Sequence, residues 1–207
     1  PEQERAIMAH FESTTLATPE TGVSANSNEA IDGIEHRWSA GGTGAVITVD
    51  DFARARFALK KANVPDRGLV AIVDPSVEFT LNTLSQLTSV ANNPKWEGIV
   101  STGIATGMNF IANIYGFDVY TSNYLKDITD GALNTSADAA VDFSTVNGKA
   151  NLFFSTDGAA TPFVGAWRQM PEVDFEYNKD FQRNEFVTTA RYGVKLYRPE
   201  NMVRVIS

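Results

Sequence analysis

The order of apolar and polar positions predicts both helices and strands in this chain. The clearest helix spans residues 49–63, where Phe52 and Leu59 belong to one apolar stripe. Thr48 precedes this helix and Asp51 follows three positions later, which is the spacing of a capping box. We therefore expect an amphipathic helix whose start is defined by its own side chains.

A short run at 69–73 is wholly apolar and partly β-branched. Such a run is typical of a strand that is buried on both faces. Asp74 and Pro75 follow as an N-cap and a first helical residue. The pattern predicts a second helix over 75–87, with four side chains turned inward: Val77, Leu81, Leu84 and Leu87.

The second half of the chain is rich in strand patterns. Residues 114–122 alternate as one strand. Asn147 and Gly148 form a favoured type I′ turn sequence, which predicts a hairpin of 141–146 with 150–155. Further strands are predicted at 163–168, 173–177, 186–197 and 202–206.

The remaining segments are less regular. Residues 2–12 have the pattern of the end of a helix, and residues 88–112 fit no single element. Small, polar and glycine-rich stretches predict loops at 13–31, 41–44, 126–140 and 156–162. The whole pattern predicts an α+β fold with mixed sheets flanked by helices.

Composition narrows the class of protein. The 207 residues include no cysteine, which excludes disulfide frameworks, thiolate nucleophiles and cysteine-ligated zinc. No apolar run reaches the roughly 18 residues of a membrane-spanning helix, and the first residues are too polar for a secretory signal. A net charge of −8 disfavours a dedicated DNA-binding protein.

Charge is unevenly distributed along the sequence. Residues 181–207 carry a net charge of +3, whereas residues 118–157 carry −4. A basic end and an acidic middle suit contacts between copies of one chain. Two differently solvated surfaces explain the same pattern, so both interpretations stay open at this point.

Side chains suited to catalysis or metal binding are sparse. The two histidines are His10 and His36, and we interpret His36 as a solvated or helix-end histidine rather than part of a relay. The glycine-rich stretch 41–44 lacks the lysine of a phosphate-binding loop. Four aspartates lack the spacing of a calcium-binding loop, and we interpret them as surface acids: Asp127, Asp130, Asp138 and Asp142. No catalytic residue, cofactor or metal site is predicted.

The order of three stretches along the chain carries information about its family. They are VDDFARARFALKKANVPDRGLVAIVDPSVEFTL at 49–81, NIYGFDVYTSNYL at 113–125 and FVTTARYGVKLYRPENMVRVI at 186–206. In sequence, order and spacing they resemble the major capsid proteins of tailed bacteriophages that have the Hong Kong 97-type fold. Each stretch alone is a weak signal, but their order across one chain is considerably more specific.

The resemblance implies an axial and a peripheral domain. Residues 1–48 would hold the end of a spine helix and a loop-rich peripheral segment, and residues 49–162 the axial domain. Residues 163–207 would supply peripheral strands and a C-terminal strand that returns to the axial domain. Family members also carry an N-terminal arm, an extended loop hairpin and a long spine helix, which we do not find in this sequence.

The resemblance also implies a function. Copies of the chain would assemble through hexamers and pentamers into an icosahedral shell around double-stranded DNA, in the host cytoplasm, and remain in the virion. Its other partners would be a decoration, cement or scaffolding protein and non-specifically contacted DNA, with no membrane and no enzymatic activity. An encapsulin-type compartment with protein cargo is an alternative with the same fold. A monomeric binding module, and a hydrolase that uses Asp, Glu or His36, are alternatives of other classes.

Five residues are candidates for contacts between subunits. Arg198 and Glu200 flank a proline at a predicted sheet edge, where we expect them to pair with charges of a neighbouring subunit. Arg191 and Lys195 belong to the basic C-terminal stretch, which suits an acidic neighbour or the backbone of packaged DNA. Gly116 permits close backbone approach, although a β-bulge glycine is an equal alternative.

Overall fold

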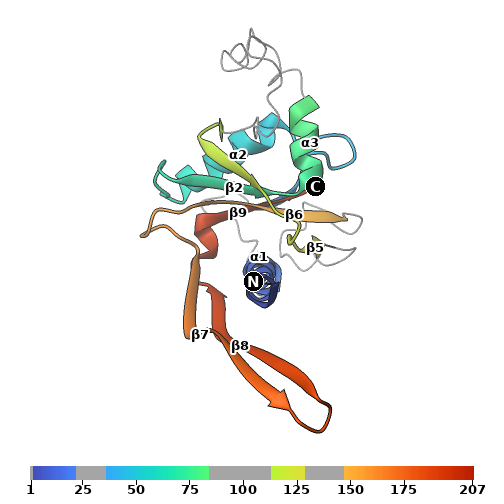
Figure 1. The fold of residues 1–207 in the computed structure, drawn as a ribbon. Helices are drawn as coiled ribbons and strands as arrows, with labels where there is room; N and C mark the ends of the chain where they lie inside the picture. Colours follow the sequence, from blue (N-terminus) through green and yellow to red (C-terminus); the bar gives the residue numbers. More distant parts are fainter. Residues whose placement is uncertain (1, 22–35, 84–112, 129–146) are drawn as a thin grey trace, which may run out of the picture.

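A mixed sheet forms the main body of the protein (Figure 1). The structure is a computed structural model, and it describes residues 2–21, 36–83, 113–128 and 147–207. The strand order of the mixed sheet is β1-β9-β6-β2-β4-β3, with β5 paired to β6, and a second sheet consists of β7 and β8. The helices are α1 (Glu2–Thr21), α2 (Val49–Lys61), α3 (Pro75–Thr83) and the 3₁₀ turn η2 (Pro199–Asn201). The strands are β1 (Arg37–Ser39), β2 (Leu69–Val73), β3 (Asn113–Ile114), β4 (Phe117–Thr121), β5 (Asp127–Ile128), β6 (Gly148–Ser155), β7 (Phe163–Asn178), β8 (Arg183–Leu196) and β9 (Met202–Ile206).

Parallel and antiparallel pairs coexist in the main sheet. Strands β1 and β9 are parallel, as are β2 and β4, whereas β6 runs antiparallel to both β2 and β9. The predicted α+β class with a mixed sheet is confirmed.

Helices cover both faces of the main sheet. Figure 1 shows α2 and α3 on one side and α1 on the other. Phe153 of β6 packs under α2, where its ring lies 5.0 Å from that of Phe52. Its neighbours Leu152 and Phe154 face the opposite cluster, together with Leu16 of α1. Because successive side chains of a strand point to opposite faces, β6 is apolar at both.

Strand β2 packs against other side chains on both faces, but only one face is fully buried, so the prediction of full burial on both faces is confirmed for one. Leu69, Ala71 and Val73 belong to the cluster under α2. Val70 and Ile72 are half-buried and pack against the cluster that contains α1. The strand therefore joins the two apolar layers of the domain.

Helix α2 begins where the sequence predicts. The backbone N–H and the hydroxyl of Thr48 both donate to the Asp51 carboxylate at 2.8 Å. The same carboxylate accepts the backbone N–H of Gly41 at 3.1 Å and the indole N–H of Trp38 at 3.3 Å. Asp51 thus connects the start of the helix to the preceding loop and to β1.

Helix α3 also begins as predicted. The Asp74 carboxylate accepts the backbone N–H of Ser76 at 3.0 Å and its hydroxyl at 2.6 Å. Val77 and Leu81 are buried on its inner face, as expected. The end of the predicted helix, with Leu84 and Leu87, and all of 88–112 lie outside the described residues.

Helix α1 extends further than predicted. The loop prediction is wrong for 13–21, which is helical, while 22–31 lies outside the described residues. Side-chain hydroxyls in this segment bond one turn back, as from Thr14 to the carbonyl of His10 at 2.8 Å. Leu16 is buried against the main sheet. Burial against the sheet therefore stabilises a helix in a segment whose composition favours a loop.

The segment around Gly116 is a hairpin, not a single strand. Strands β3 and β4 pair antiparallel, and the two residues between them, Tyr115 and Gly116, have φ angles of 51° and 90°. Positive φ at both central residues is the geometry of a type I′ turn. Neither the strand-interior position nor the bulge predicted for Gly116 is correct, because this glycine makes the turn itself.

Asn147 and Gly148 do not form the predicted turn. Gly148 is the first residue of β6 and pairs with Ile128 of β5, and its φ is not positive. A Cβ at this position would collide with the carbonyl of Ser207. The glycine permits close approach of the chain end, while the predicted partner strand 141–146 lies outside the described residues.

The two strands predicted at 163–168 and 173–177 are one strand, β7. Its pairing with β8 shifts register on either side of Gln169, between Trp167 and Glu172. These irregularities explain why the alternation in the sequence is interrupted. Strand β9 has its predicted start and end.

Candidate intersubunit surface

Strands β7 and β8 form a two-stranded ribbon that projects from the main sheet (Figure 1). Phe163 pairs with Leu196 at the base of the ribbon, and Asn178 pairs with Arg183 at its tip. An isolated two-stranded hairpin is marginally stable in water. The ribbon therefore depends on contacts beyond its own pairing.

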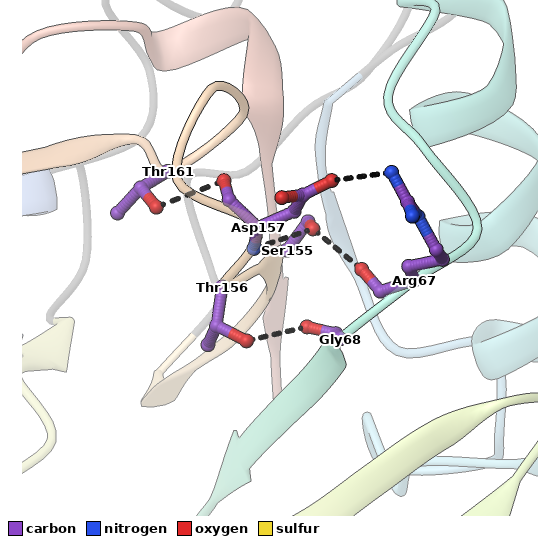
Figure 2. Close-up of polar contacts among 6 residues, drawn as sticks. All are labelled: Arg67, Gly68, Ser155, Thr156, Asp157 and Thr161. Carbon is purple, nitrogen blue, oxygen red and sulfur yellow. Dashed lines mark hydrogen bonds and ion pairs between the residues drawn. The ribbon is translucent and has the colours of Figure 1, made fainter.

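The connection from β6 to β7 is fixed to the start of β2 (Figure 2). The Ser155 hydroxyl donates to the carbonyl of Arg67 at 2.8 Å, and the Thr156 hydroxyl donates to the carbonyl of Gly68 at 3.0 Å. The Arg67 guanidinium lies 3.4 Å from the Asp157 carboxylate. These bonds attach the segment that leads into β7 to the main sheet.

The segment that follows β8 is bonded to the segment that leads into β7. The backbone N–H groups of Tyr197 and Arg198 both donate to the carbonyl of Pro162, at 2.8 and 3.2 Å. The buried side chain of Asn201 donates to the carbonyl of Ala160 at 3.0 Å. The ribbon thus leaves the main sheet through a joint that is hydrogen-bonded on both sides.

Helix α1 supports one face of the ribbon base. The ring of Phe11 stacks on Trp167 and meets Tyr192 edge-on, with centroids 5.0 Å apart in both pairs. Nearer the start of the helix, the Thr188 hydroxyl donates to the side-chain oxygen of Gln3 at 2.5 Å. We call this side the inner face of the ribbon.

Toward the tip, the inner face is apolar and exposed. Phe175 and Phe186 lie directly opposite each other on the two strands, with ring centroids 5.2 Å apart. Their exposed fractions are 62% and 56%. Val173 and Tyr177 extend the same exposed row along β7. Contiguous exposed apolar side chains mark interaction surfaces.

The structure brings three of the five predicted contact residues together. Arg191 and Lys195 are exposed on the face of β8 opposite Tyr192, and Arg198 follows just beyond the strand. The Arg198 guanidinium donates to the carbonyl of Ala159 at 3.4 Å, which is a contact within the chain. A pairing of these three residues with a neighbouring subunit stays a prediction.

The other two predicted contact residues lie elsewhere. Glu200 is half-buried in η2, and no ion pair joins it to Arg198 among the described residues. Gly116 lies in the β3–β4 turn, at the edge of the main sheet. Their roles in subunit contacts also stay predictions.

His36 is buried, so the interpretation of a solvated histidine is wrong. Its Nδ1 lies 3.3 Å from the carbonyl oxygen of Met202. Burial lowers the pKa of His36 below its ordinary value, and the nearby Arg204 acts in the same direction. The ring is 2% exposed, so it is not accessible to a substrate.

The acidic middle of the chain offers no metal site in its described part. Asp127 is exposed and forms an ion pair of 2.7 Å with Lys149, which confirms a surface acid. Asp130, Asp138 and Asp142 lie outside the described residues. Within 2–21, 36–83, 113–128 and 147–207, no group of three or more acidic or histidine side chains could hold a metal ion. None of the helices in these ranges is long and apolar enough to cross a membrane.

The exposed aromatic row of the ribbon is absent from the sequence-based candidates. The sequence does contain a trace of this row, because Val173, Phe175 and Tyr177 alternate with charged residues along one strand. The strand pattern predicted at 173–177 does not reveal the exposure, because alternation shows that side chains share a face but not whether anything covers it.

The mixed sheet and the projecting ribbon with its exposed aromatic row suit a protein that contacts other chains. A sequence model described as "phage capsid protein" matches residues 2–205. The chain belongs to this family of phage capsid proteins. No curated protein matches its sequence.

Solved structures confirm the Hong Kong 97-type fold. A structure titled "Mycobacterium phage Che8" matches with a TM-score of 0.65 and 19% identity, covering 97% of this chain and 59% of that one. The capsid of the cyanophage P-SCSP1u matches with a TM-score of 0.59 and 15% identity, covering 97% and 62%. The present chain therefore spans less than two thirds of the length of these relatives.

An encapsulin is a weaker match. The holo-SrpI encapsulin complex from Synechococcus elongatus PCC 7942 has a TM-score of 0.50 and 9% identity, covering 97% of this chain and 61% of that one. The same fold therefore occurs in both kinds of shell.

Proposed function

We propose that the chain is the shell-forming part of a major capsid protein, which assembles through hexamers and pentamers into an icosahedral shell around double-stranded DNA. The family match over residues 2–205 carries this proposal. The projecting ribbon supports it, because its aromatic row is exposed in the single chain and suits burial against another protein. Shell assembly needs complementary contacts that close into rings rather than catalytic groups.

The two-domain division also remains a proposal. The main sheet with α2 and α3 corresponds to the axial domain expected at 49–162, to which β1 and the returning strand β9 are added. Helix α1 and the ribbon correspond to the peripheral domain. In this assignment, the hydrogen-bonded joint sets the angle between the two domains.

Contact with packaged DNA would be limited and non-specific. Of the basic residues in the C-terminal stretch, Arg204 is fully buried and Arg183 forms an ion pair of 2.8 Å with Glu185. Arg191 and Lys195 remain exposed on the ribbon. Backbone electrostatics of this kind predicts weak binding that falls steeply with salt.

An encapsulin-type compartment is the second candidate. The match to the SrpI encapsulin complex favours it, although at a lower TM-score than the phage matches. Its cargo would be protein rather than DNA. The fold is common to both, so the contents of the shell distinguish the two functions.

The test is negative-stain microscopy with sedimentation of the protein expressed from its complete reading frame. Closed shells, or rings of six and five, are the expected result. Nuclease-protected DNA inside the shells would support the virion function, and enclosed protein without nucleic acid would support the encapsulin. A protein that stays monomeric at high concentration would contradict both.

A further inference from the structure

The outer face of the ribbon, which is the face turned away from α1, separates basic from acidic side chains along its length. Near the base it carries Arg191 and Lys195, which pair across the ribbon with Gln169 and Val164. Toward the tip the same face carries three exposed carboxylates, from Glu172, Asp174 and Glu176. The face is therefore basic at one end and acidic at the other.

The two charged halves do not neutralise each other within one chain. In the described part of the chain, no ion pair engages Asp174, Glu176, Arg191 or Lys195. Asp174 lies opposite Val187, four residues along β8 from Arg191, which is a separation of roughly 13 Å. Glu172 is nearer, since it lies opposite Thr189, only two residues from Arg191. The two carboxylates nearer the tip, Asp174 and Glu176, therefore lie beyond the Debye length of about 8 Å at physiological salt. Each half thus presents its charge to the surroundings.

The acidic half also contains an unfavourable pair. Glu176 lies directly opposite Glu185, and like charges at this spacing destabilise a ribbon. Arg183 and Asn178 bind Glu185 at 2.8 and 2.9 Å, but no cation of the described chain binds Glu176. A positive charge brought from outside the chain would relieve this repulsion.

We propose that the outer face docks on the outer face of a second copy, with the two ribbons antiparallel. This arrangement places the acidic half of each ribbon on Arg191 and Lys195 of the other, so that one contact forms both sets of ion pairs. A contact of this symmetry is self-complementary. The proposal rests on the proposed shell function, for which it names a specific contact between subunits.

A second copy fits this face better than a nucleic acid does. A polyanion would bind the basic half but would be repelled by the three carboxylates on the same face. Only a partner with both charges, in the opposite order, satisfies the whole length. Another copy of this ribbon has that order.

Charge-swapped variants of the full chain test the contact. The first variant is Asp174→Lys with Glu176→Lys, the second is Arg191→Glu with Lys195→Glu, and the third combines all four changes. These side chains are exposed, so each variant keeps the native fold, as circular dichroism can verify. We expect each half-swapped variant to reduce the assembled fraction in sedimentation at least about tenfold. The combined variant should restore it in large part, because it reverses the four charges that are proposed to pair and preserves their complementarity.

Two results would overturn the contact while leaving the shell function intact. One is normal assembly of either half-swapped variant. This includes the outcome in which the variant Arg191→Glu with Lys195→Glu assembles normally and loses only its binding to DNA. The other is a combined variant that assembles no better than the half-swapped ones. If the unmodified protein forms no oligomer, the proposed function itself fails, and the contact fails with it.

Discussion

The side-chain amide of Asn201 donates a hydrogen bond of 3.0 Å to the carbonyl oxygen of Ala160, across the joint between the main sheet and the ribbon. Ala160 precedes β7 and Asn201 precedes β9, so the bond joins the chain entering the ribbon to the chain leaving it. Both residues are buried. A buried polar contact at this place couples the direction of the ribbon to the packing of the sheet.

Replacement of Asn201 by alanine should lower the free energy of unfolding by about 1–3 kcal/mol, because it leaves the buried carbonyl of Ala160 without a donor. Urea denaturation measures the loss. Asn123→Ala is the control, since Asn123 is exposed. Equal stability of the two variants would show that the bond across the joint contributes nothing.

Asp51→Asn should destabilise the protein by about 2 kcal/mol, because an amide cannot accept all the bonds that Asp51 receives from Thr48, Gly41 and Trp38. The matched control is Asp50→Asn, an exposed acid in the same helical turn, for which we expect less than about 1 kcal/mol. The midpoints of chemical unfolding compare the two. A larger effect at Asp50 would contradict the structural role of Asp51.

Stability should fall in mild acid through His36. Burial lowers the pKa of His36 in the folded protein, so below about pH 6.5 the unfolded chain binds a proton that the folded chain does not. This contribution is absent above that pH and grows as the pH falls toward the folded-state pKa. His36→Gln should therefore flatten the decline in unfolding free energy between neutral pH and pH 5, relative to the unmodified protein.

His10→Gln is the control for this pH dependence. His10 is the other histidine of the chain and is exposed on α1, so its replacement separates an effect of the buried ring from an effect of histidine content alone. Parallel pH curves for His36→Gln and the unmodified protein would refute the assignment of the slope to His36.

Gly116→Ala should cost about 1–2 kcal/mol, because φ at this residue is 90° and a Cβ is strained in that region of backbone. Gly158→Ala is the matched control, since Gly158 has no positive φ and nothing lies within 4 Å of the added carbon. Thermal unfolding distinguishes them. If the Gly116 variant is as stable as the control, the type I′ turn is not required in solution.

Arg198→Glu should impair assembly if Arg198 pairs with an acidic residue of a neighbouring subunit. The measurement is the fraction of protein in shells after sedimentation, together with the unfolding midpoint of the dissociated chain. Loss of assembly with an unchanged midpoint supports the intersubunit pair. Normal assembly would assign Arg198 to its bond with Ala159 inside the chain.

Local chemistry alone was enough to predict several elements. The Thr48–Asp51 spacing predicted the start of α2, because the groups that satisfy the first turn are neighbours in sequence. The Asp74–Pro75 pair did the same for α3, and a continuous apolar run predicted β2. The bounds of β9 were also predicted, although Arg204 interrupts its apolar residues. The order of three stretches identified the capsid family and its fold, which the family match and the solved structures confirm.

Only the tertiary structure decided the features that depend on distant segments. Residues 13–21 are helical because Leu16 is buried against the main sheet, and Gly148 is a strand residue because the chain end lies against it. His36 is buried and lies 3.3 Å from the carbonyl oxygen of Met202 in β9, a residue 166 positions away in the sequence. The alternation of side chains along β7 defined two faces of the ribbon. Which part of a face is buried depends on how far α1 extends along the ribbon. Sequence pattern therefore determined the local elements and the family, whereas long-range packing determined which surfaces remain free for a partner.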